Sequence, residues 1–511
     1  MKRSLLSIFL ATTLLIAPSY SREHLSQLFS DNQAIIYTIN IRNFGAIDKD
    51  KDGIIDPEKG DIRGTFVNAQ KKLPELQKEG INTVYLLPIT KVGKLKALGT
   101  AGSLYALDSF NEIAPELDDL NNEKTALEEA KDFVKYAHDL NINVILDLPS
   151  CGSYDLSLNK PDWFIQEKDD LKNEAKIPAD WTDVRLFKVF DDEQKEILNK
   201  ETLENFKNFV DLAQNIGFDG IRADVAAIKP YVFWKNLIDY AKKKNPNFVF
   251  IAEASPTWDN PAPNGVSHYA SIDELLNAGF DGYYGSFSDF KNLKTKKEFD
   301  KNANTNKKIL QKHKNKAIMI TLATHDQQAP ILRGKNYWNT VLWLSCTLPL
   351  NTYFLDGFKV GDDFTYEYEN KPAQKTSTDD EFYFVHSGMF DIFNFTGPIR
   401  PKHPELKSQY LKAIQFKKSN LDLYKFGKFE LLKTNNEKIY GYTMTVNKKQ
   451  LAVVGSLEEK EDLQATIKPS YLKKEHKTSI INATGSFEDT KNAIKTTLKP
   501  LEIKVYLITL N

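Results

Sequence analysis

Short apolar runs alternate with amphipathic segments along most of the chain. Several of the runs are almost continuously apolar, which is typical of parallel strands covered on both faces. The segments between them have a helical period of apolar residues, as in 124–140, 200–216 and 231–244. This alternation predicts βα units and a parallel sheet. The eight strand-like runs are 34–40, 82–87, 143–148, 220–224, 248–253, 279–284, 317–322 and 350–355.

Eight such runs favour an α/β fold of the (β/α)₈ TIM-barrel type, although strand counting alone leaves an open sheet possible. We expect the barrel to comprise residues 22–148 and 197–424. The intervening 149–196 are irregular and rich in polar and aromatic residues, which predicts a small excursion domain over the barrel mouth. Beyond about residue 425 short alternating runs replace the helical patterns, so 425–511 are expected to form a C-terminal antiparallel β-sandwich domain.

The N-terminus has the pattern of an export signal. Lys2 and Arg3 precede an apolar stretch at 5–18, and 19–21 supply small residues for a cleavage site. An uncleaved membrane anchor is the alternative. The mature chain has no second apolar run of membrane-spanning length. We therefore expect residues 1–21 to be a signal peptide and the protein to be periplasmic or extracellular, with no membrane association after cleavage.

The charge balance and the cysteine content limit which binding partners and which disulfides are expected. The chain has 68 Lys and Arg against 69 Asp and Glu, and this balance argues against a nucleic-acid or anionic-membrane surface. Cys151 and Cys346 are the two cysteines. Export would permit a disulfide, but two cysteines so far apart are interpreted as free thiols. No organic cofactor is expected, and the oligomeric state does not follow from the sequence.

Acidic residues end several of the expected strands. Asp224 and Glu253 close the fourth and fifth runs, Asp147 is the last residue but one of the third, and Asp326 follows the seventh. Any one of them could be a salt-bridge partner. Functional residues of such a barrel gather at the C-terminal ends of its strands, however, and burying an unpaired carboxylate is costly. Arg222 lies two residues before Asp224, so both side chains face the same side of their strand.

The ordered set of motifs resembles the signature regions of the α-amylase superfamily, glycoside hydrolase family 13, over roughly residues 34–425. The resemblance implies that Asp224 is the nucleophile, Glu253 the general acid/base and Asp326, next to His325, the stabiliser of the transition state. The run Gly-Ser-Leu-Tyr ending at Tyr105 is similar to a family loop whose tyrosine stacks under the sugar at the cleavage point.

The resemblance implies a retaining glycoside hydrolase that cleaves α-1,4-linked glucan or maltooligosaccharides through a covalent glycosyl-enzyme. Arg222 would keep Asp224 ionised, and Glu253 would need a raised pKa to protonate the leaving oxygen. His325 and Asp326 would bind ring hydroxyls. A transglycosylase or maltosyltransferase with the same intermediate is the nearest alternative, and a non-catalytic glycan- or partner-binding barrel is a third.

Some surroundings depart from the family pattern. After Asp147 the family has an Asn-His pair that is missing here, so Asp147 is expected to orient Arg222. A Lys-His pair that commonly follows the nucleophile is also absent. The segments around 147–151, 161–164 and 228–234 instead resemble the maltose-1-phosphate maltosyltransferase branch. Trp163, in the excursion, is a candidate sugar platform, with ordinary packing as the alternative.

A second cluster of carboxylates follows the first strand. Asp48, Asp50, Asp52 and Asp56 surround a glycine turn, and the backbone carbonyl of Ile54 could join them. Alternating oxygens of this kind can wrap around Ca²⁺. Family members have a similar loop at this place. We expect a structural Ca²⁺ at the barrel rim, with a plain polar turn as the alternative.

Overall fold

The computed structural model describes most of the chain after residue 21. No helix within the part described is long and apolar enough to cross a membrane. The expected export signal lies outside the described residues. These are 22–51, 55–97, 102–169, 172–178, 181–192, 195–256, 258, 267–327, 329–363, 401–483, 487–490 and 492–511.

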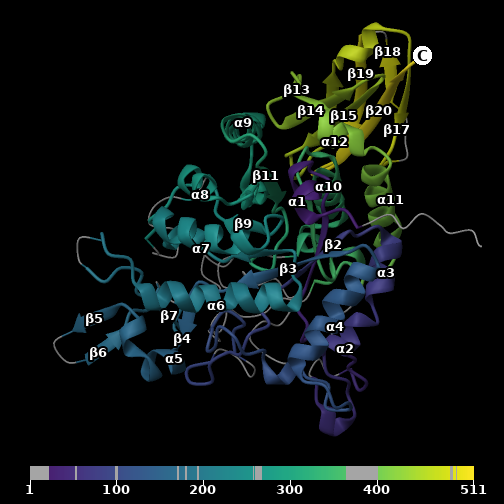
Figure 1. Ribbon diagram of the computed structural model, residues 1–511. Coiled ribbons are helices and arrows are strands. Elements are labelled where there is room, and N and C mark those ends of the chain that lie inside the picture. The colour runs from purple at the N-terminus through teal and green to yellow at the C-terminus, as the bar shows by residue number, and fades with distance from the viewer. Residues whose placement is uncertain are drawn as a thin grey trace, which may run out of the picture.

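Eight parallel strands form the centre of the molecule (Figure 1). They follow one another in the order β11-β10-β9-β8-β3-β2-β1-β12. The two edges of this order meet, because Asn351 N donates to Ile318 O at 2.9 Å and accepts, through its carbonyl oxygen, from Ile320 N at 3.1 Å. The sheet is therefore a barrel, and the open-sheet alternative is excluded. The strands are β1 (Ile35–Ile39), β2 (Thr83–Leu86), β3 (Asn143–Leu148), β8 (Gly220–Ala223), β9 (Val249–Glu253), β10 (Gly282–Ser286), β11 (Ala317–Ile320) and β12 (Thr352–Leu355).

Every residue of the eight barrel strands is buried, since helices cover their outer faces. Local signals delimit these helices. In α4, Thr125 and Glu128 form a reciprocal capping box, and α6 ends at Gly217 in the left-handed conformation. The helices of this layer are α2 (Phe66–Gln70), α3 (Leu73–Glu79), α4 (Ala126–Asp139), α6 (Lys200–Ile216), α7 (Tyr231–Lys244), α8 (Ile272–Ala278), α9 (Lys296–Lys312), α10 (Lys335–Thr347) and α11 (Leu406–Lys418). A further helix, α12 (Leu421–Phe426), packs against β14 of the C-terminal region.

A short helix, α1 (Leu25–Ser30), lies at the N-terminal ends of the strands. Asn351, next to β12, donates its side-chain amide to Phe29 O at 2.8 Å. Gly220 and Gly282 begin β8 and β10, and a Cβ at either would approach Leu25 or Phe29 as well as the neighbouring strand. Glycine is therefore required where α1 packs across this end of the barrel.

The segment between β3 and α6 contains two small antiparallel sheets. β4 (Cys151–Ser153) pairs with β7 (Val184–Leu186), and β5 (Gln166–Asp169) pairs with β6 (Lys172–Ala175). α5 (Tyr154–Asn159) follows β4 directly. A cluster of aromatic rings in stacked, tilted and edge-on contacts joins the segment to the barrel; its members are Phe110, Phe164, Phe187 and Phe206. Figure 1 shows these elements projecting from one side of the barrel.

The C-terminal region forms two antiparallel sheets, which confirms the expected β domain. One has the order β13-β14-β15-β20-β17 and the other β16-β19-β18. One face of the larger sheet packs on the barrel through residues such as Tyr440 and Tyr442, and its other face forms a separate core with the smaller sheet. The strands are β13 (Lys428–Leu431), β14 (Ile439–Val446), β15 (Lys449–Ser456), β16 (Leu463–Ile467), β17 (His476–Ile480), β18 (Glu488–Thr490), β19 (Ala493–Leu498) and β20 (Ile503–Leu510).

Both cysteines are buried and free. Cys151 lies in β4, and Cys346 lies in α10 among residues that are buried on every side of the helix. The prediction of two free thiols is confirmed. The apolar run around Cys346 is a helix held between the barrel and the β domain, where Thr340 Oγ1 donates to Leu501 O at 2.7 Å.

Candidate active site

One buried guanidinium connects the ends of three neighbouring strands. Arg222 Nη1 on β8 donates to Asp147 Oδ1 at 3.0 Å on β3 and to Asp224 Oδ1 at 3.0 Å. Its Nη2 forms an ion pair with Glu253 Oε1 at 2.8 Å on β9. Asp147 and Arg222 are direct partners in the β3–β8 register, and this pairing aligns their side chains. The parallel strands therefore place three carboxylates around a single positive charge.

The charge balance of this group is negative. Burial lowers the pKa of Arg222, but Asp147 and Glu253 outweigh that effect and hold the pKa well above its ordinary value. Burial raises the pKa of Asp224 to about 6, with Arg222 acting in the opposite direction. Burial likewise raises the pKa of Glu253 well above its ordinary value, and Asp224 and Asp326 add to the increase. Near neutral pH this arrangement favours an ionised Asp224 beside a protonated Glu253.

Backbone amides hold both carboxyl groups in place. Val225 N donates to Glu253 Oε2 at 2.6 Å, and Ser150 N lies 3.4 Å from Asp224 Oδ2. Val225 has φ +35° and ψ +52°, in the left-handed region that β-branched residues rarely adopt. Backbone strain of this kind often accompanies functional sites. Here the unusual conformation directs a peptide N–H toward a carboxyl group.

A tyrosine and a histidine complete the cluster from the loops after β2 and β11. The Tyr105 hydroxyl donates to Asp147 Oδ2 at 2.8 Å and lies 2.7 Å from His325 Nε2. Since that single hydroxyl proton serves Asp147, His325 Nε2 must carry the proton of their shared hydrogen bond. Burial lowers the pKa of His325, which favours the neutral imidazole. His325 Nε2 is also 3.5 Å from Asp326 Oδ1, and the Asp326 side chain is 40% exposed.

Seven of the eight predicted catalytic and substrate-binding residues therefore gather at one end of the barrel. Asp147 contacts Arg222, as expected of a residue that orients it. The eighth, Trp163, packs against Phe110 at 6.4 Å between ring centroids, with Lys160 Nζ 5.5 Å from its ring. The structure thus assigns Trp163 packing contacts in the excursion, and its role as a sugar platform stays a prediction.

The sequence interpretation missed several residues that shape this group. Tyr85 donates its hydroxyl to Asp147 from inside the barrel, and the ring of Tyr284 lies 4.9 Å from the Arg222 guanidinium. β10 has a register shift between Tyr284 and Ser286, and Gly285 lies at this bulge with φ +138°. Both tyrosines belong to apolar strand runs. The alternation of side chains along a strand could have indicated that they face the inside of the barrel.

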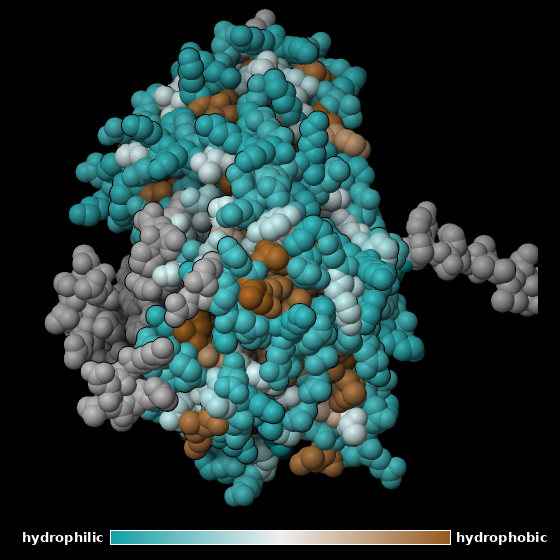
Figure 2. Space-filling model, turned by 60° about the vertical axis from the view of Figure 1, so that its left-hand side comes forward, coloured by the Kyte–Doolittle hydropathy of each residue, from teal (hydrophilic) through white to brown (hydrophobic). Residues whose placement is uncertain are grey.

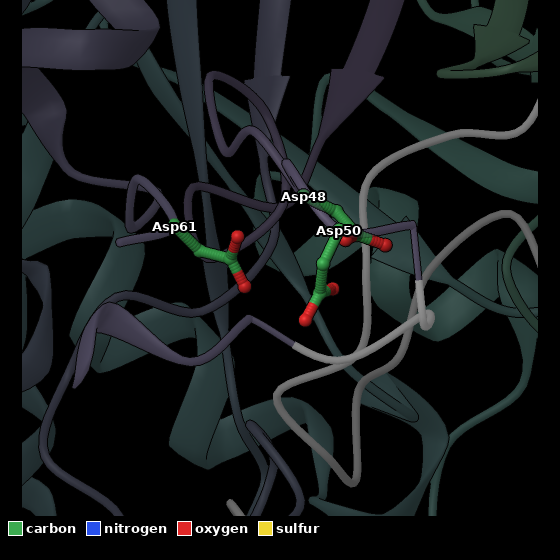
Figure 3. A group of neighbouring side chains, drawn as sticks. All are labelled: Asp48, Asp50 and Asp61. Atoms are coloured by element: carbon green, nitrogen blue, oxygen red, sulfur yellow. The ribbon is translucent and has the colours of Figure 1, made fainter. Parts of the chain in front are cut away.

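The carboxylates after β1 partly match the expected metal loop (Figure 3). Asp48, Asp50 and Asp61 each offer an oxygen atom within 4.8 Å of the others. Asp61 was not predicted; the backbone pairing of Ile47 with Ile62 brings it beside the loop. Three carboxylates fit a hard cation such as Ca²⁺.

Asp56 is not part of this group of three. Its Oδ1 accepts from Glu58 N at 3.0 Å and caps a short 3₁₀ helix, Pro57–Lys59, and its role as a ligand stays a prediction. Asp61 already accepts from Lys49 N at 2.8 Å and from Asp56 N at 2.9 Å. These bonds orient the Asp61 carboxylate. Asp52 and Ile54 lie outside the described residues.

No family model matches the chain. Its sequence is similar to curated α-1,4-glucan:maltose-1-phosphate maltosyltransferases. The protein of Bifidobacterium animalis subsp. lactis is 28% identical over 223 residues, which are 42% of this chain and 29% of that protein. The protein of Methylacidiphilum infernorum is 30% identical over 208 residues, 37% of this chain and 29% of that protein. The chain thus spans less than a third of the length of these relatives.

Solved structures share the fold over nearly the whole chain. A maltogenic α-amylase from Thermotoga neapolitana has a TM-score of 0.65 at 20% identity, covering 94% of this chain and 99% of that one. An α-amylase from Lactobacillus plantarum has a TM-score of 0.66 at 18% identity with the same coverage. These likenesses confirm the resemblance to α-amylase-type enzymes in fold, and the sequence similarity confirms the resemblance to the maltosyltransferase branch.

Proposed function

We propose that the protein is a retaining glycoside hydrolase that acts on α-1,4-linked glucan or maltooligosaccharides. The observation that carries the proposal is the buried Arg222, whose guanidinium contacts Asp147, Asp224 and Glu253 at the C-terminal ends of the strands. Glycoside cleavage with retention needs one ionised and one protonated carboxyl group close together. The burial and charge around Asp224 and Glu253 favour that division of protonation states.

In the proposed reaction Asp224 attacks the anomeric carbon while Glu253 gives its proton to the departing glycosidic oxygen. The products of this step are the shortened glucan and a glycosyl ester on Asp224. Glu253, now ionised, takes a proton from water, which attacks the same carbon and releases Asp224. The Tyr105 ring supplies a face beside the reacting sugar, and Asp326 accepts hydrogen bonds from the sugar hydroxyls. His325 donates its Nε2–H to the Tyr105 hydroxyl in the free protein, and this donor would turn to a ring hydroxyl when the sugar binds.

Glucan transfer through the same glycosyl-enzyme is the second candidate. The sequence relatives named as maltosyltransferases favour it, since their similarity covers about two fifths of this chain. In a transferase, a sugar hydroxyl or inorganic phosphate would replace water as acceptor. The nucleophile and general acid/base would be unchanged, so the acceptor alone distinguishes the two activities.

Incubation with maltoheptaose, with and without inorganic phosphate, tests the proposal. Hydrolysis increases the number of reducing ends, whereas transfer redistributes chain lengths with little increase. A phosphate acceptor yields a glycosyl phosphate only when phosphate is present. If no product forms under any of these conditions and glucan still binds, the protein is a glycan-binding barrel and the enzymatic proposal is wrong.

We also propose that the loop after β1 binds a structural Ca²⁺ ion through Asp48, Asp50 and Asp61. Three negatively charged side chains near one another repel, and a divalent cation would relieve that repulsion. Isothermal titration calorimetry with Ca²⁺ should detect one site that is lost in an Asp50→Asn variant. Absence of heat with the parent protein after chelator treatment would contradict this proposal.

We propose further that residues 1–21 direct export and are removed. The sequence pattern of positive residues, apolar stretch and small residues supports this. N-terminal sequencing of the protein from its native cells should begin at or near Arg22. A chain that retains Met1 and partitions with membranes would contradict the proposal.

A further inference from the structure

A second buried cation lies next to the carboxylate cluster. Lys229 follows β8 and the 3₁₀ turn Ala226–Ile228, and it is 1% exposed. Its Nζ donates to the carbonyl oxygen of Ser150 at 2.7 Å. Two aromatic rings enclose the ammonium, with centroids at 4.7 Å for Phe206 on α6 and 5.9 Å for Phe233 on α7. A lysine in such surroundings needs a specific role, because an isolated charge is expensive to bury.

Ser150 connects this lysine to Asp224. Its amide N lies 3.4 Å from Asp224 Oδ2, and its hydroxyl donates to the backbone carbonyl of Asp224. Lys229 Nζ donates to the backbone carbonyl of Ser150 itself. Ser150 is thus fixed at three points, two on Asp224 and one on Lys229. Movement of the Lys229 side chain would therefore release a donor from the Asp224 carboxylate.

Among the described residues, two ionisable groups influence the charge of Lys229, namely Cys151 and Asp224. Burial lowers the pKa of Lys229 to about 8, while Cys151 and Asp224 oppose that decrease. Burial raises the pKa of the Cys151 thiol to about 12, so that thiol is uncharged. Asp224 is then the anion whose charge Lys229 feels near neutral pH. Each group stabilises the charged form of the other.

We propose that Lys229 is a positioning residue for Asp224, which fixes Ser150 against the carboxylate and supplies a second buried positive charge in addition to Arg222. The proposal rests on the nucleophilic role given to Asp224 above. The positive charge favours the ionised carboxylate before attack and again when the glycosyl ester is cleaved. Arg222 contacts three carboxylates at once, whereas Lys229 is linked through Ser150 to Asp224, and this link distinguishes Asp224 from Glu253.

Substitution of Lys229 by methionine removes the charge and the Ser150 bond at similar side-chain length. In a Lys229→Met variant, the acidic limb of the kcat/KM profile on maltoheptaose should move upward by about one pH unit, since loss of a nearby cation raises a carboxyl pKa. kcat should fall more than KM changes. Lys229→Arg keeps the positive charge, so the acidic limb of its kcat/KM profile should lie close to that of the parent protein. A purely structural role of Lys229 would not predict this dependence on charge.

Lys417 provides a matched control. It is also fully buried, and its Nζ donates to Leu350 O and Thr352 Oγ1, both at 2.8 Å, at the start of β12. Burial lowers its pKa to about 7. Lys417→Met removes an equally buried charge away from the carboxylates. The acidic limb should stay in place in this variant even if its thermal stability falls.

A double-mutant cycle tests the same coupling without substrate. The unfolding midpoints of Lys229→Met, Asp224→Asn and the double variant are compared at pH 7 and pH 5. We expect non-additive shifts at pH 7, where Asp224 is ionised, and additive shifts at pH 5. Lys417→Met combined with Asp224→Asn should be additive at both pH values.

The two experiments separate the possible failures. If the parent protein has no activity on glucans but the cycle shows coupling at pH 7, the proposed function is wrong and the Lys229–Asp224 interaction stands. Additive shifts at both pH values would overturn the inference about Lys229. So would an acidic limb that does not move in an active Lys229→Met variant, or one that Lys417→Met moves equally.

Discussion

The two ends of the barrel use acidic side chains in different ways. At the N-terminal ends of the strands, Asp219 accepts from Arg22 at 2.7 Å and from Val144 N at 2.8 Å. Asp281 similarly accepts from Lys242 at 2.7 Å and from Phe250 N at 2.8 Å. Each of these acids thus pairs with a separate cationic side chain and accepts a hydrogen bond from the backbone amide of a neighbouring strand. At the opposite end three acids share Arg222.

This difference separates structural from reactive carboxylates. An acid with its own cation and hydrogen bonds to a strand amide contributes to the connection between strands. Acids that share one cation compete for it, and burial then favours the proton on one of them. The end of the barrel with surplus negative charge is therefore the end where proton transfer is feasible.

Substitution of one acid at each end of the barrel should give the largest difference in activity between the two ends. Asp224→Asn removes the nucleophile and should lower kcat on maltoheptaose by about 10⁴-fold or more. Asp219→Asn should leave kcat within about twofold and lower the unfolding midpoint instead, because it weakens one structural ion pair. Initial rates and thermal melts of the two purified variants measure both effects. Equal losses of activity would contradict the division between the two ends.

Glu253→Gln should lower kcat on maltoheptaose by about 10²–10⁴-fold, since it removes general acid catalysis. The loss should be much smaller in the first step with α-maltosyl fluoride, because fluoride leaves without a proton. Burst kinetics of fluoride release give this step directly. An equal loss with both substrates would mean that Glu253 only maintains the shape of the site.

Asp147→Ala should destabilise the protein by about 3–5 kcal/mol, because it removes the common acceptor of three buried donors, the hydroxyls of Tyr85 and Tyr105 and the Nη1 of Arg222. Asp281→Ala, at the opposite end, removes the partner of a half-buried lysine and should cost about 1–3 kcal/mol. Urea denaturation followed by tryptophan fluorescence compares the two. A larger loss for Asp281→Ala would show that the shared cation is no more sensitive than a separate pair.

The pH dependence of kcat/KM should follow the two raised pKa values. Asp224 must be ionised, so activity should fall about tenfold per unit as the pH decreases below about 6. Glu253 must be protonated, so activity should also fall as the pH rises through its raised pKa. Buffered rates from pH 4 to 10 define both limbs. An acidic limb near the ordinary aspartate pKa would contradict the effect of burial.

The smallest expected effect concerns the carboxylates after β1, away from the shared cation. Chelator treatment should lower the unfolding midpoint by about 2–5 °C, since a bound ion stabilises the folded state. Asp61→Asn should reduce that difference, and kcat at saturating Ca²⁺ should change little. A chelator that abolishes activity without changing the midpoint would assign the ion to the reaction instead.

The strand pattern and the strand-end acids were predictable from the sequence because both depend on local periodicity. β8 and β3 lie within one residue of their expected limits, whereas β10 begins three residues later because Gly279 ends α8 with φ +120°. The positions of Asp61 and Lys229 could not be predicted. Each depends on contacts between segments, through the Ile47–Ile62 pairing or the carbonyl of Ser150.

The central claim of the proposed mechanism is that the glycosyl group becomes attached to Asp224, one of the three acids that share Arg222. The Glu253→Gln variant, mixed with α-maltosyl fluoride, should form the glycosyl ester and release it slowly. Peptide mass spectrometry of the quenched protein should then find one maltosyl group on the peptide that contains Asp224, and none when Asp224→Asn is added. A maltosyl group on another residue, or turnover with inverted anomeric configuration and no adduct, would contradict the account.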